Sequence, residues 1–201
     1  MNKKDITKAI QNLQKGEVIV YPTDTLYALG ADIYNIKAVK KIFKIKKRPY
    51  SLPLPIAVSN IEMIKEIAKV DANSKKIIKN FLPGPLTLVL IKKKHISKLI
   101  TSGKNTIAIR IPDNEIALDL ISKYGPLTAT SANVHGKKTP YIINKINMQF
   151  KQEKLKTYLD VGKLNGKPST IIDLTKNKIK ILRKGPITEN EIMEVIKKDG
   201  R

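Results

Sequence analysis

Cysteine does not occur in this chain of 201 residues. Disulfide bonds, zinc sites built on thiolates and cysteine nucleophiles are therefore excluded, and the composition fits a reducing cytoplasm. Histidine is nearly absent as well, because His95 and His135 are the only two and neither belongs to an H-E-x-x-H pattern. The sequence therefore predicts no metal centre of its own.

Long apolar runs are missing too. The longest, residues 86–91, is far too short to cross a bilayer, and the first ten residues lack the apolar core of a signal peptide. We therefore expect a cytoplasmic protein with no membrane partner. A length of 201 residues suits one domain, 1–201, with a core that needs no covalent cross-link.

Acidic residues are few: 17 Asp and Glu stand against 39 Lys and Arg, which gives a net charge of +22. A polyanionic partner, such as RNA or nucleotide phosphates, would explain this excess. A general preference for lysine and isoleucine explains it as well, and we favour this for the bulk of the charge because the lysines are scattered. Only four basic residues are arginine, so the arginines are the better functional candidates.

Hydrophobic periodicity predicts helices and strands that alternate along the chain. Helices are expected from Ile6 to the residues before Gly16, from Asn35 to Lys46, after a Ser59–Glu62 capping box, at 73–81, at 114–125 after Asp113, and after a Thr188–Glu191 capping box. Strands are expected at 17–21, 54–58, 86–91, 106–111, 126–130, 158–161, 169–174 and 178–182. This alternation indicates an α/β fold, in which helices cover a mixed sheet.

The common phosphate-binding loops are absent. The stretches "SGKNT" and "HGKKT" both lack the Ser or Thr that follows Gly-Lys in a P-loop, and no G-x-G-x-x-G occurs. A nucleotide site in this chain must use another arrangement.

Polar residues gather instead at four predicted strand ends or loops: "PTDT" from Pro22, "KIKKRP" from Lys44, "TIAIRIPD" from Thr106 and "TATSANVHG" from Thr128. In the third, strand alternation places Thr106, Ala108 and Arg110 on the face opposite the isoleucines. A buried unpaired charge is costly, so Arg110 requires an anion.

Each cluster also has a purely structural explanation. Asp24 or Thr25 can bond the local backbone in a turn, and the cations near Arg48 can favour a helix end. Arg110 can pair with Asp113 or another acid, and the hydroxyls around Ser131 can be capping groups. Singly, these explanations are sufficient, but four such clusters in one chain favour a binding site.

Six segments, taken in order, resemble the Sua5/YciO/YrdC family of L-threonylcarbamoyladenylate synthases. They are "PTDTLYALG", "KIKKRP…PLPIAVS", "LPGPLTLVL", "TIAIRIPD", "TATSANVHG" and "STIIDL…ILRKG". The resemblance runs from about Gly16 to Gly185. One such motif is weak, whereas six in the same order are specific.

The resemblance implies an open, twisted, mixed α/β sheet flanked by helices, with a large positively charged cavity. Longer members add a C-terminal domain, so this chain is similar to the short single-domain form. The implied activity makes threonylcarbamoyl-AMP and pyrophosphate from L-threonine, bicarbonate and ATP, with Mg²⁺ accompanying ATP. A partner complex then transfers the threonylcarbamoyl group to adenosine 37 of tRNA.

The resemblance also implies roles for particular residues. Those matching the ATP-binding and catalytic K-x-R and S-x-N elements are Lys46, Arg48, Ser131 and Asn133, and Arg183 matches a further arginine on the phosphate side. Those matching the threonine pocket are Thr25, Thr106, Arg110, Thr130 and Ser169, with Arg110 expected to hold the substrate carboxylate through two hydrogen bonds.

Two positions depart from the family pattern. Ala57 stands where many members have a histidine that lines the threonine pocket, and Ala28 stands where glycine is more usual. An alternative function is a non-catalytic module of the same fold that binds double-stranded RNA or tRNA, or regulates. A third is carbamoyl adenylation in hydrogenase maturation, although those proteins are larger and carry zinc and acylphosphatase segments that this chain lacks.

Overall fold

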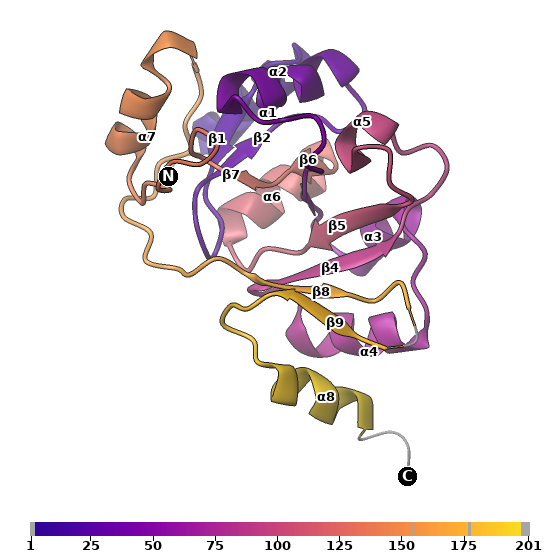
Figure 1. Ribbon diagram of the computed structural model, residues 1–201. Coiled ribbons are helices and arrows are strands. Elements are labelled where there is room, and N and C mark those ends of the chain that lie inside the picture. The colour runs from indigo at the N-terminus through magenta and orange to yellow at the C-terminus, as the bar shows by residue number, and fades with distance from the viewer. Residues whose placement is uncertain (1–2, 154, 177, 198–201) are drawn as a thin grey trace.

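Two β-sheets lie at the centre of the computed structural model, which describes residues 3–153, 155–176 and 178–197 (Figure 1). In this part of the chain, a three-stranded sheet has the order β1-β2-β7 and a six-stranded sheet the order β6-β3-β5-β4-β8-β9. The strands are β1 (Ile19–Tyr21), β2 (Ala28–Gly30), β3 (Ile56–Ala57), β4 (Leu86–Ile91), β5 (Thr106–Arg110), β6 (Leu127–Thr128), β7 (Thr130–Ser131), β8 (Thr170–Asp173) and β9 (Lys180–Arg183).

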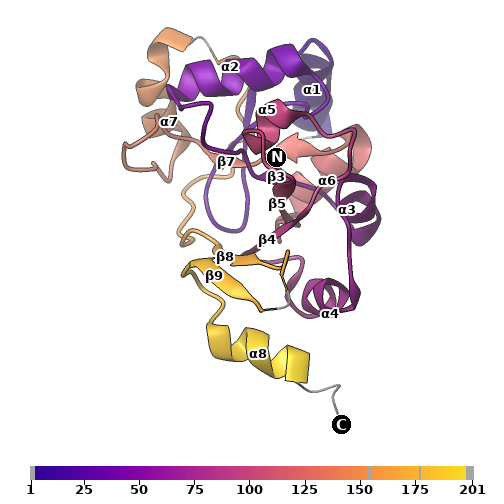
Figure 2. The ribbon, with the colours of Figure 1, turned by 45° about the vertical axis from the view of Figure 1, so that its right-hand side comes forward.

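Helices surround these sheets (Figure 2). They are α1 (Lys3–Gln14), α2 (Ile36–Lys46), α3 (Ile61–Ile67), α4 (Ala72–Phe81), α5 (Lys98–Thr101), α6 (Glu115–Tyr124), α7 (Ile143–Gln149), the 3₁₀ helix η1 (Lys151–Glu153) and α8 (Glu189–Lys197). Both views place α8 beyond β9 at one end of the molecule and α1 and α2 at the other. No helix in the described part of the chain is long and apolar enough to cross a membrane.

The six-stranded sheet is mixed, as predicted. Strand β5 pairs parallel with β3 and antiparallel with β4, and β4 pairs parallel with β8. Strands β1 and β2 form an antiparallel pair, and the segment between them is the polar "PTDTLY" stretch. The first polar cluster therefore lies in the connection of a β-hairpin.

Residues 126–130, predicted to be one strand, are divided between the two sheets. Thr128 of β6 pairs with Ile56 in the large sheet, whereas Thr130 of β7 pairs with Leu29 in the small one. The chain crosses over at Ala129, whose N–H donates to the carbonyl of Pro55. This crossover brings the "TATSAN" cluster to the place where both sheets meet.

Three local predictions are wrong in their details. Asn60, not Ser59, caps α3 by accepting from the N–H of Met63, and Asn114, not Asp113, caps α6. Residues 158–161 form no strand, because only an isolated bridge joins Tyr158 to Val20.

Two other caps are confirmed. Asn35 accepts from the N–H of Ala38 at 3.1 Å and so begins α2. Thr188 and Glu191 bond each other's backbone N–H groups, which is the reciprocal pattern of a capping box before α8.

The apolar side chains form two clusters. The larger includes Ile107 and Ile109 of β5 with the inner faces of α2, α3 and α4. The smaller joins α1 to α6 and contains Ala57, which is fully buried. Each cluster also contributes to the lining of the cavity described below, the larger through Tyr27 and the smaller through Ala28.

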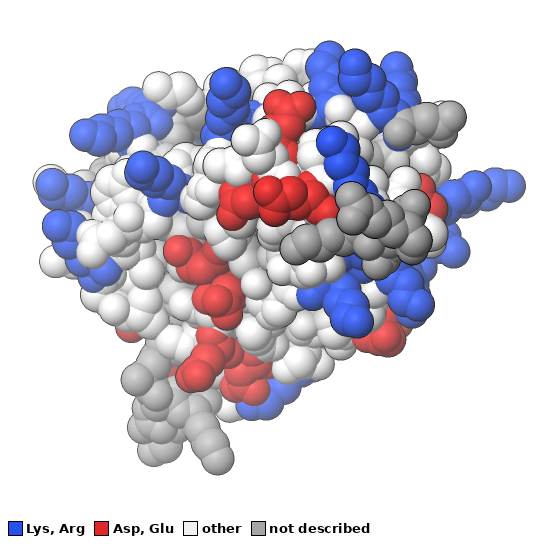
Figure 3. All heavy atoms as spheres, turned by 90° about the horizontal axis from the view of Figure 1, so that it is seen from below, with Lys and Arg blue, Asp and Glu red and all other residues white. Residues whose placement is uncertain are grey.

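Charge is unevenly distributed on the surface. Figure 3 shows the molecule from below, the side on which α8 lies in Figure 1. Acidic side chains gather in the middle of this face, while lysines and arginines lie mainly around its rim. The positive net charge of +22 is therefore not spread evenly over the surface.

Candidate functional site

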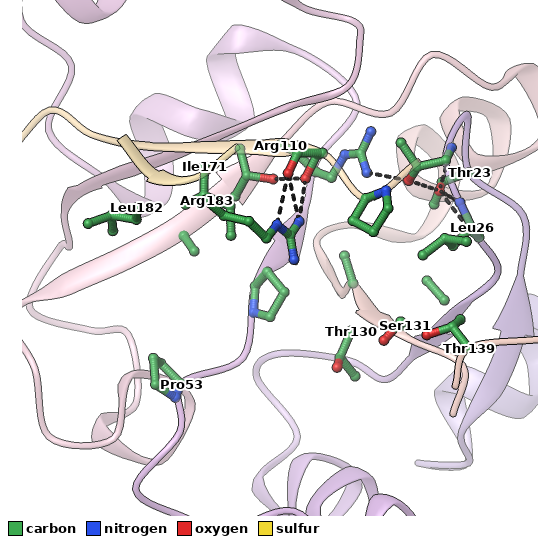
Figure 4. Close-up of a pocket in the computed structure, with 18 of the residues that line it drawn as sticks. Thr23, Leu26, Pro53, Arg110, Thr130, Ser131, Thr139, Ile171, Leu182 and Arg183 are labelled. Atoms are coloured by element: carbon green, nitrogen blue, oxygen red, sulfur yellow. Dashed lines mark hydrogen bonds between the residues drawn. The ribbon is translucent and has the colours of Figure 1, made fainter. Parts of the chain in front are cut away.

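Both sheets contribute to a cavity of about 420 Å³ (Figure 4). The polar side chains that line it belong to Thr23, Thr25, Arg48, Thr87, Arg110, Thr130, Ser131, Thr139, Ser169 and Arg183. None of the described residues that line it is Asp or Glu. Three guanidinium groups among hydroxyls suit an anionic, hydrogen-bonding ligand.

Two threonines shape the hairpin connection at one wall. The hydroxyl oxygen of Thr23 accepts from the N–H groups of Thr25 and Leu26 at 3.2 and 3.1 Å, which closes the turn. It also lies 3.0 Å from the hydroxyl oxygen of Thr25. Thr23 thus closes the turn, and both Thr23 and Thr25 line the cavity.

Arg110 finds its anion in Asp24. Its Nη2 lies 2.6 and 2.8 Å from the two carboxylate oxygens, and its Nη1 donates to the hydroxyl of Thr25 at 2.9 Å. The side chains of Arg110 and Asp24 are only 6% and 13% exposed, so this is a buried ion pair. Asp113, the acid named from sequence, instead donates its backbone N–H to Asp24 at 3.2 Å.

Not every donor of Arg110 is used by the described residues. Its buried Nε has no hydrogen-bond partner among the described residues. A buried guanidinium donor without a partner is costly. This nitrogen is too deeply buried to meet a ligand directly, so the donor available to one is the second N–H of Nη1, which among the described residues donates only to Thr25.

Arg183 and Ser169 meet at the opposite wall. Nε and Nη2 of Arg183 donate to the carbonyl of Ser169 at 3.0 and 2.8 Å, and Nη2 also donates to its hydroxyl at 3.0 Å (Figure 4). The hydroxyl of Ser169 lies 2.8 Å from that of Thr87 on β4. Burial, and secondarily the charge of Arg110, lowers the pKa of Arg183. An anion between these two arginines would relieve their mutual repulsion.

Arg48 is held by the loop that follows it. Its Nε donates to the carbonyl of Leu52 at 3.2 Å and its Nη2 to that of Pro53 at 3.0 Å. Arg48 is half-buried, and burial lowers the pKa of its guanidinium. Because its partners are neutral carbonyls, the positive charge stays uncompensated at the cavity wall.

Lys46 and Asn133 lie behind the wall rather than in it. Lys46 is 2% exposed, Asn133 is 8% exposed, and neither lines the cavity, whereas Ser131 does. The Nζ of Lys46 donates to the backbone carbonyls of Ser131 and Asn133 at 2.5 and 2.7 Å. The position of Lys46 therefore gives no support to the direct phosphate contact predicted for it.

Two more expected pocket residues lie elsewhere. Thr106 begins β5 and does not line the cavity, although Ala108 and Arg110 on the same face do. Thr106 is four residues from Arg110, about 13 Å along a strand, which explains the separation. The expectation that Ala57 lines the pocket is wrong, because it is buried in the smaller apolar cluster.

The histidines are also outside the cavity. His95 stacks on Tyr34, with ring centroids 6.4 Å apart. His135 is exposed, and its backbone N–H donates to the carbonyl of Lys46 at 2.7 Å. Neither imidazole lines the cavity.

Sequence reasoning missed several residues that form the site. Asp24 was treated as a turn residue, and no role was given to Thr87, Thr139 or Gly166. A side chain at Gly166 would collide with backbone atoms of Thr25 and Asp24, so this glycine lets the later chain pack against the hairpin. The position of Asp24 inside "PTDT" was an available signal, since Arg110 on β5 of the other sheet needed an acid.

Comparisons with known proteins agree with this architecture. The chain is 40% identical over 192 residues to a protein of Methanocaldococcus jannaschii named putative threonylcarbamoyl-AMP synthase, covering 93% of this chain and 90% of that one. It is 38% identical to the threonylcarbamoyl-AMP synthase of Pyrococcus abyssi, where the match covers 92% of this chain but only 55% of the relative.

Solved structures give the same result. The Pyrococcus abyssi Sua5 protein complexed with L-threonine matches with a TM-score of 0.93 at 37% identity, over 98% of this chain and 58% of that one. Escherichia coli YciO matches with a TM-score of 0.87 at 28% identity, over 95% and 94%. The model of the Sua5/YciO/YrdC family, described as telomere recombination, matches residues 11–185. This chain therefore belongs to the Sua5/YciO/YrdC family.

Proposed function

We propose that this protein is an L-threonylcarbamoyladenylate synthase, which makes threonylcarbamoyl-AMP and pyrophosphate from L-threonine, bicarbonate and ATP. The observation that carries the proposal is the convergence of Arg48, Arg110 and Arg183, from three distant parts of the chain, on one cavity whose described lining contains no acid. The names of the relatives, and a neighbouring structure that contains L-threonine, support this choice.

The threonine end of the proposed site consists of Thr25, Arg110 and Thr130 together with Ser169, whose contact with Arg183 joins this end to the nucleotide end, and all four line the cavity. Because Asp24 occupies Nη2 of Arg110, the bidentate grip expected from sequence is not open to a substrate carboxylate. The second N–H of the Nη1 of Arg110 is the donor that we assign to it, because Nη1 donates only to Thr25 among the described residues. Hydroxyls nearby can accept from the substrate ammonium or bond its side-chain hydroxyl.

The nucleotide end consists of Arg48 and Arg183, and we assign Ser131, which lines the same cavity, to it as well. The guanidinium groups are prepositioned by backbone carbonyls, so they need little rearrangement to meet phosphate oxygens. Lys46 and Asn133 support this end from behind, and a contact of Thr106 with substrate remains a prediction.

The chemistry requires positioning more than a reactive protein group. The amine of threonine takes up CO₂ or bicarbonate to give a carbamate. A carbamate oxygen then bonds to the α-phosphorus of ATP as the bond from that phosphorus to the bridging oxygen breaks, and pyrophosphate leaves. Two anions must meet in this step, so neutralisation by arginine and alignment of the reactants supply the catalysis.

We propose that Mg²⁺ arrives with ATP. Among the residues that the structure describes, no group of three or more His, Cys, Asp or Glu side chains could hold a metal ion. Mg²⁺ commonly binds through substrate phosphates with few protein ligands. The ion would supply charge neutralisation on the phosphates, while the residues of this chain orient the substrates.

The product would serve tRNA modification in the cytoplasm, with a separate complex transferring the threonylcarbamoyl group to adenosine 37. Direct tRNA contact would then be weak. A non-catalytic RNA-binding module is the alternative, but two arginines held by carbonyls in a cavity suit a small anion better than a duplex.

A single reaction tests the proposal. Purified protein is incubated with ATP, Mg²⁺, bicarbonate and radiolabelled threonine, and the products are separated by chromatography and identified by mass spectrometry. We expect threonylcarbamoyl-AMP and an equal amount of pyrophosphate, both dependent on bicarbonate. Absence of the labelled adenylate, together with tight binding of double-stranded RNA, would favour the alternative.

A further inference from the structure

We infer that Lys46 is a positioning residue: its ammonium group holds the segment 131–139 through Asn133, and so fixes the hydroxyl of Ser131 at the cavity wall without touching a phosphate. The kinetic part of this inference rests on the proposed function, whereas its structural part does not. Lys46 of the K-x-R element was expected to contact ATP phosphates directly, as Arg48 is; the inference gives it a supporting role instead.

The ammonium group of Lys46 has no donor left for a ligand. Its Nζ lies 2.5 Å from the carbonyl oxygen of Ser131, 2.7 Å from that of Asn133 and 3.4 Å from the amide oxygen Oδ1 of Asn133. The protonated side chain has three N–H donors and its neutral form two, and here three oxygens surround Nζ, so neither form has a donor to spare. Arg48 lines the cavity while Lys46 does not, so the two cations have different surroundings.

The backbone of Lys46 holds the same segment at a second point. Its carbonyl accepts from the N–H of His135 at 2.7 Å. Lys46 is the last residue of α2, where helix carbonyls lack partners within the helix. The end of α2 thus grips the segment by side chain and main chain together.

Asn133 connects the ammonium group of Lys46 to the hydroxyl of Ser131. Its Nδ2 donates to the carbonyls of Val134 and Lys137 at 2.9 and 2.7 Å, which fixes the orientation of the amide. Its Oδ1 then accepts the hydroxyl proton of Ser131, with 2.6 Å between the oxygens. Because that proton is committed, Ser131 presents lone pairs to the cavity, so it can accept a hydrogen bond from the adenine N–H or a ribose O–H of ATP but not bond a phosphate oxygen.

The segment leaves the cavity wall at Ser131 and returns to it at Thr139, since both residues line the cavity. Between them, His135, Gly136 and Lys137 are exposed. The three contacts of the Lys46 ammonium and the bonds of the Asn133 amide therefore anchor a stretch whose tip is open to solvent. Loss of these contacts would make the position of Ser131 less well defined, while the two sheets would change little.

The structural test is amide hydrogen exchange on Lys46→Met, which keeps the length of the side chain and removes its donors. We expect the amides of residues 131–139, that of His135 above all, to exchange about tenfold faster or more, while those of β4 and β5 keep their rates. Lys44→Met, an exposed lysine on the same helix, is the matched control and should change nothing. Unchanged exchange in residues 131–139 would overturn the inference whether or not the protein is a synthase.

The kinetic test is a double-mutant cycle of Lys46→Met with Ser131→Ala. If Lys46 acts through Ser131, each single variant should lower kcat/KM for ATP by about 10- to 100-fold, and the double variant should be no worse than the poorer single one within about twofold. The KM for threonine should stay unchanged in all three. Losses that multiply would instead mean a direct contact between Lys46 and ATP and would reject the inference.

If Lys46→Met does not fold, Asn133→Ala can still test whether Lys46 acts through Asn133 and Ser131. Asn133→Ala leaves the ammonium with its two backbone carbonyls and removes only the amide link to Ser131. In a cycle with Ser131→Ala we again expect losses that do not multiply, and independent losses would overturn the link. A parent protein with no synthase activity would reject the proposed function alone, because hydrogen exchange still reports on the anchor.

Discussion

Arg48 is the residue whose removal should cost activity with the least cost to the fold. It is half-buried, and its partners are two loop carbonyls rather than an acid. We expect Arg48→Ala to lose about 1.5–3 kcal/mol of transition-state stabilisation, or about 10- to 150-fold in kcat/KM for ATP. Threonine-dependent pyrophosphate release measures this, and a melting curve should stay close to that of the parent.

The control for Arg48 is Lys44→Ala, which removes one positive charge from the exposed face of α2. It should keep full activity. Equal turnover in Arg48→Ala and the parent would place Arg48 outside the site.

Asp24 illustrates the opposite case, a residue that matters to the fold and the site together. Asp24→Asn would leave the buried guanidinium of Arg110 without a counter-charge, since the side chain of Arg110 is only 6% exposed. Breaking a buried pair in this way costs about 3 kcal/mol or more. We expect a lower midpoint in urea unfolding and weaker threonine binding by calorimetry.

An exposed pair provides the comparison for Asp24. Asp119 lies 2.7 Å from Lys123 on the surface of α6, where ion pairs contribute less than about 1 kcal/mol. Asp119→Asn should therefore leave both measurements nearly unchanged. If Asp24→Asn changes the urea midpoint and threonine binding no more than Asp119→Asn does, the buried pair of Asp24 and Arg110 does not contribute to stability and binding as proposed.

At the scale of elements, the hairpin connection between β1 and β2 depends on the chain that packs over it. Gly166 approaches the backbone of Thr25 and Asp24 so closely that a methyl group has no room. We expect Gly166→Ala to displace this turn, to weaken threonine binding about tenfold or more, and to destabilise the fold by about 1–3 kcal/mol. Calorimetry with threonine and a urea titration measure the two effects.

Lys167→Ala, next to Gly166 and exposed, is the matched control for the turn and should bind threonine like the parent. Normal threonine binding in Gly166→Ala would show that the turn tolerates displacement. Thr25 would then have a smaller part in recognition than its position in the lining indicates.

At the scale of the whole molecule, stability should rise with pH in the neutral to mildly alkaline range. Burial, and secondarily the charge of Arg48, lowers the pKa of Lys46 to about 7 from an ordinary value of 10.5. Between these values the unfolded chain binds a proton that the folded chain does not, so the free energy of unfolding increases as the pH rises. Urea unfolding at pH 7 and pH 9.5 measures the difference, and Lys46→Met should reduce it.

The upper limit of this pH range has a physical reason. Burial raises the pKa of Tyr27 and Tyr124 to about 12, and that of Tyr21 further. Above pH 10 the tyrosines of the unfolded chain ionise first, which destabilises the folded state. If the free energy of unfolding of Lys46→Met rises between pH 7 and pH 9.5 as much as that of the parent, groups other than Lys46 cause the pH dependence.

Binding of tRNA is also a property of the whole surface. The excess of lysine is large, but acidic side chains occupy the middle of the face seen in Figure 3, and aromatic residues are only 5% of the chain. We expect weak tRNA binding through backbone phosphates, with an affinity that falls steeply as salt increases. Fluorescence anisotropy at several salt concentrations tests this, and tight, sequence-selective binding that ignores salt would support an RNA-binding module.

Local patterns in the sequence were sufficient for much of the fold. The alternation in residues 106–111 correctly separated Ile107 and Ile109, which enter the core, from Ala108 and Arg110, which line the cavity. The cap at Asn35 was also predictable, because it depends on groups three residues apart. Six segments in a characteristic order were enough to indicate the family, which the family model confirms.

Only the tertiary structure decided which groups meet. Asp24 and Arg110 are 86 residues apart, Lys46 and Asn133 are 87 apart, and no local period relates either pair. The split of residues 126–130 between two sheets, and the burial of Ala57, likewise depend on strands elsewhere in the chain. The periodicity of a sequence shows which face of a helix or strand is apolar. The partner of a buried charge, in contrast, depends on how distant parts of the chain pack around that charge and exclude water from it.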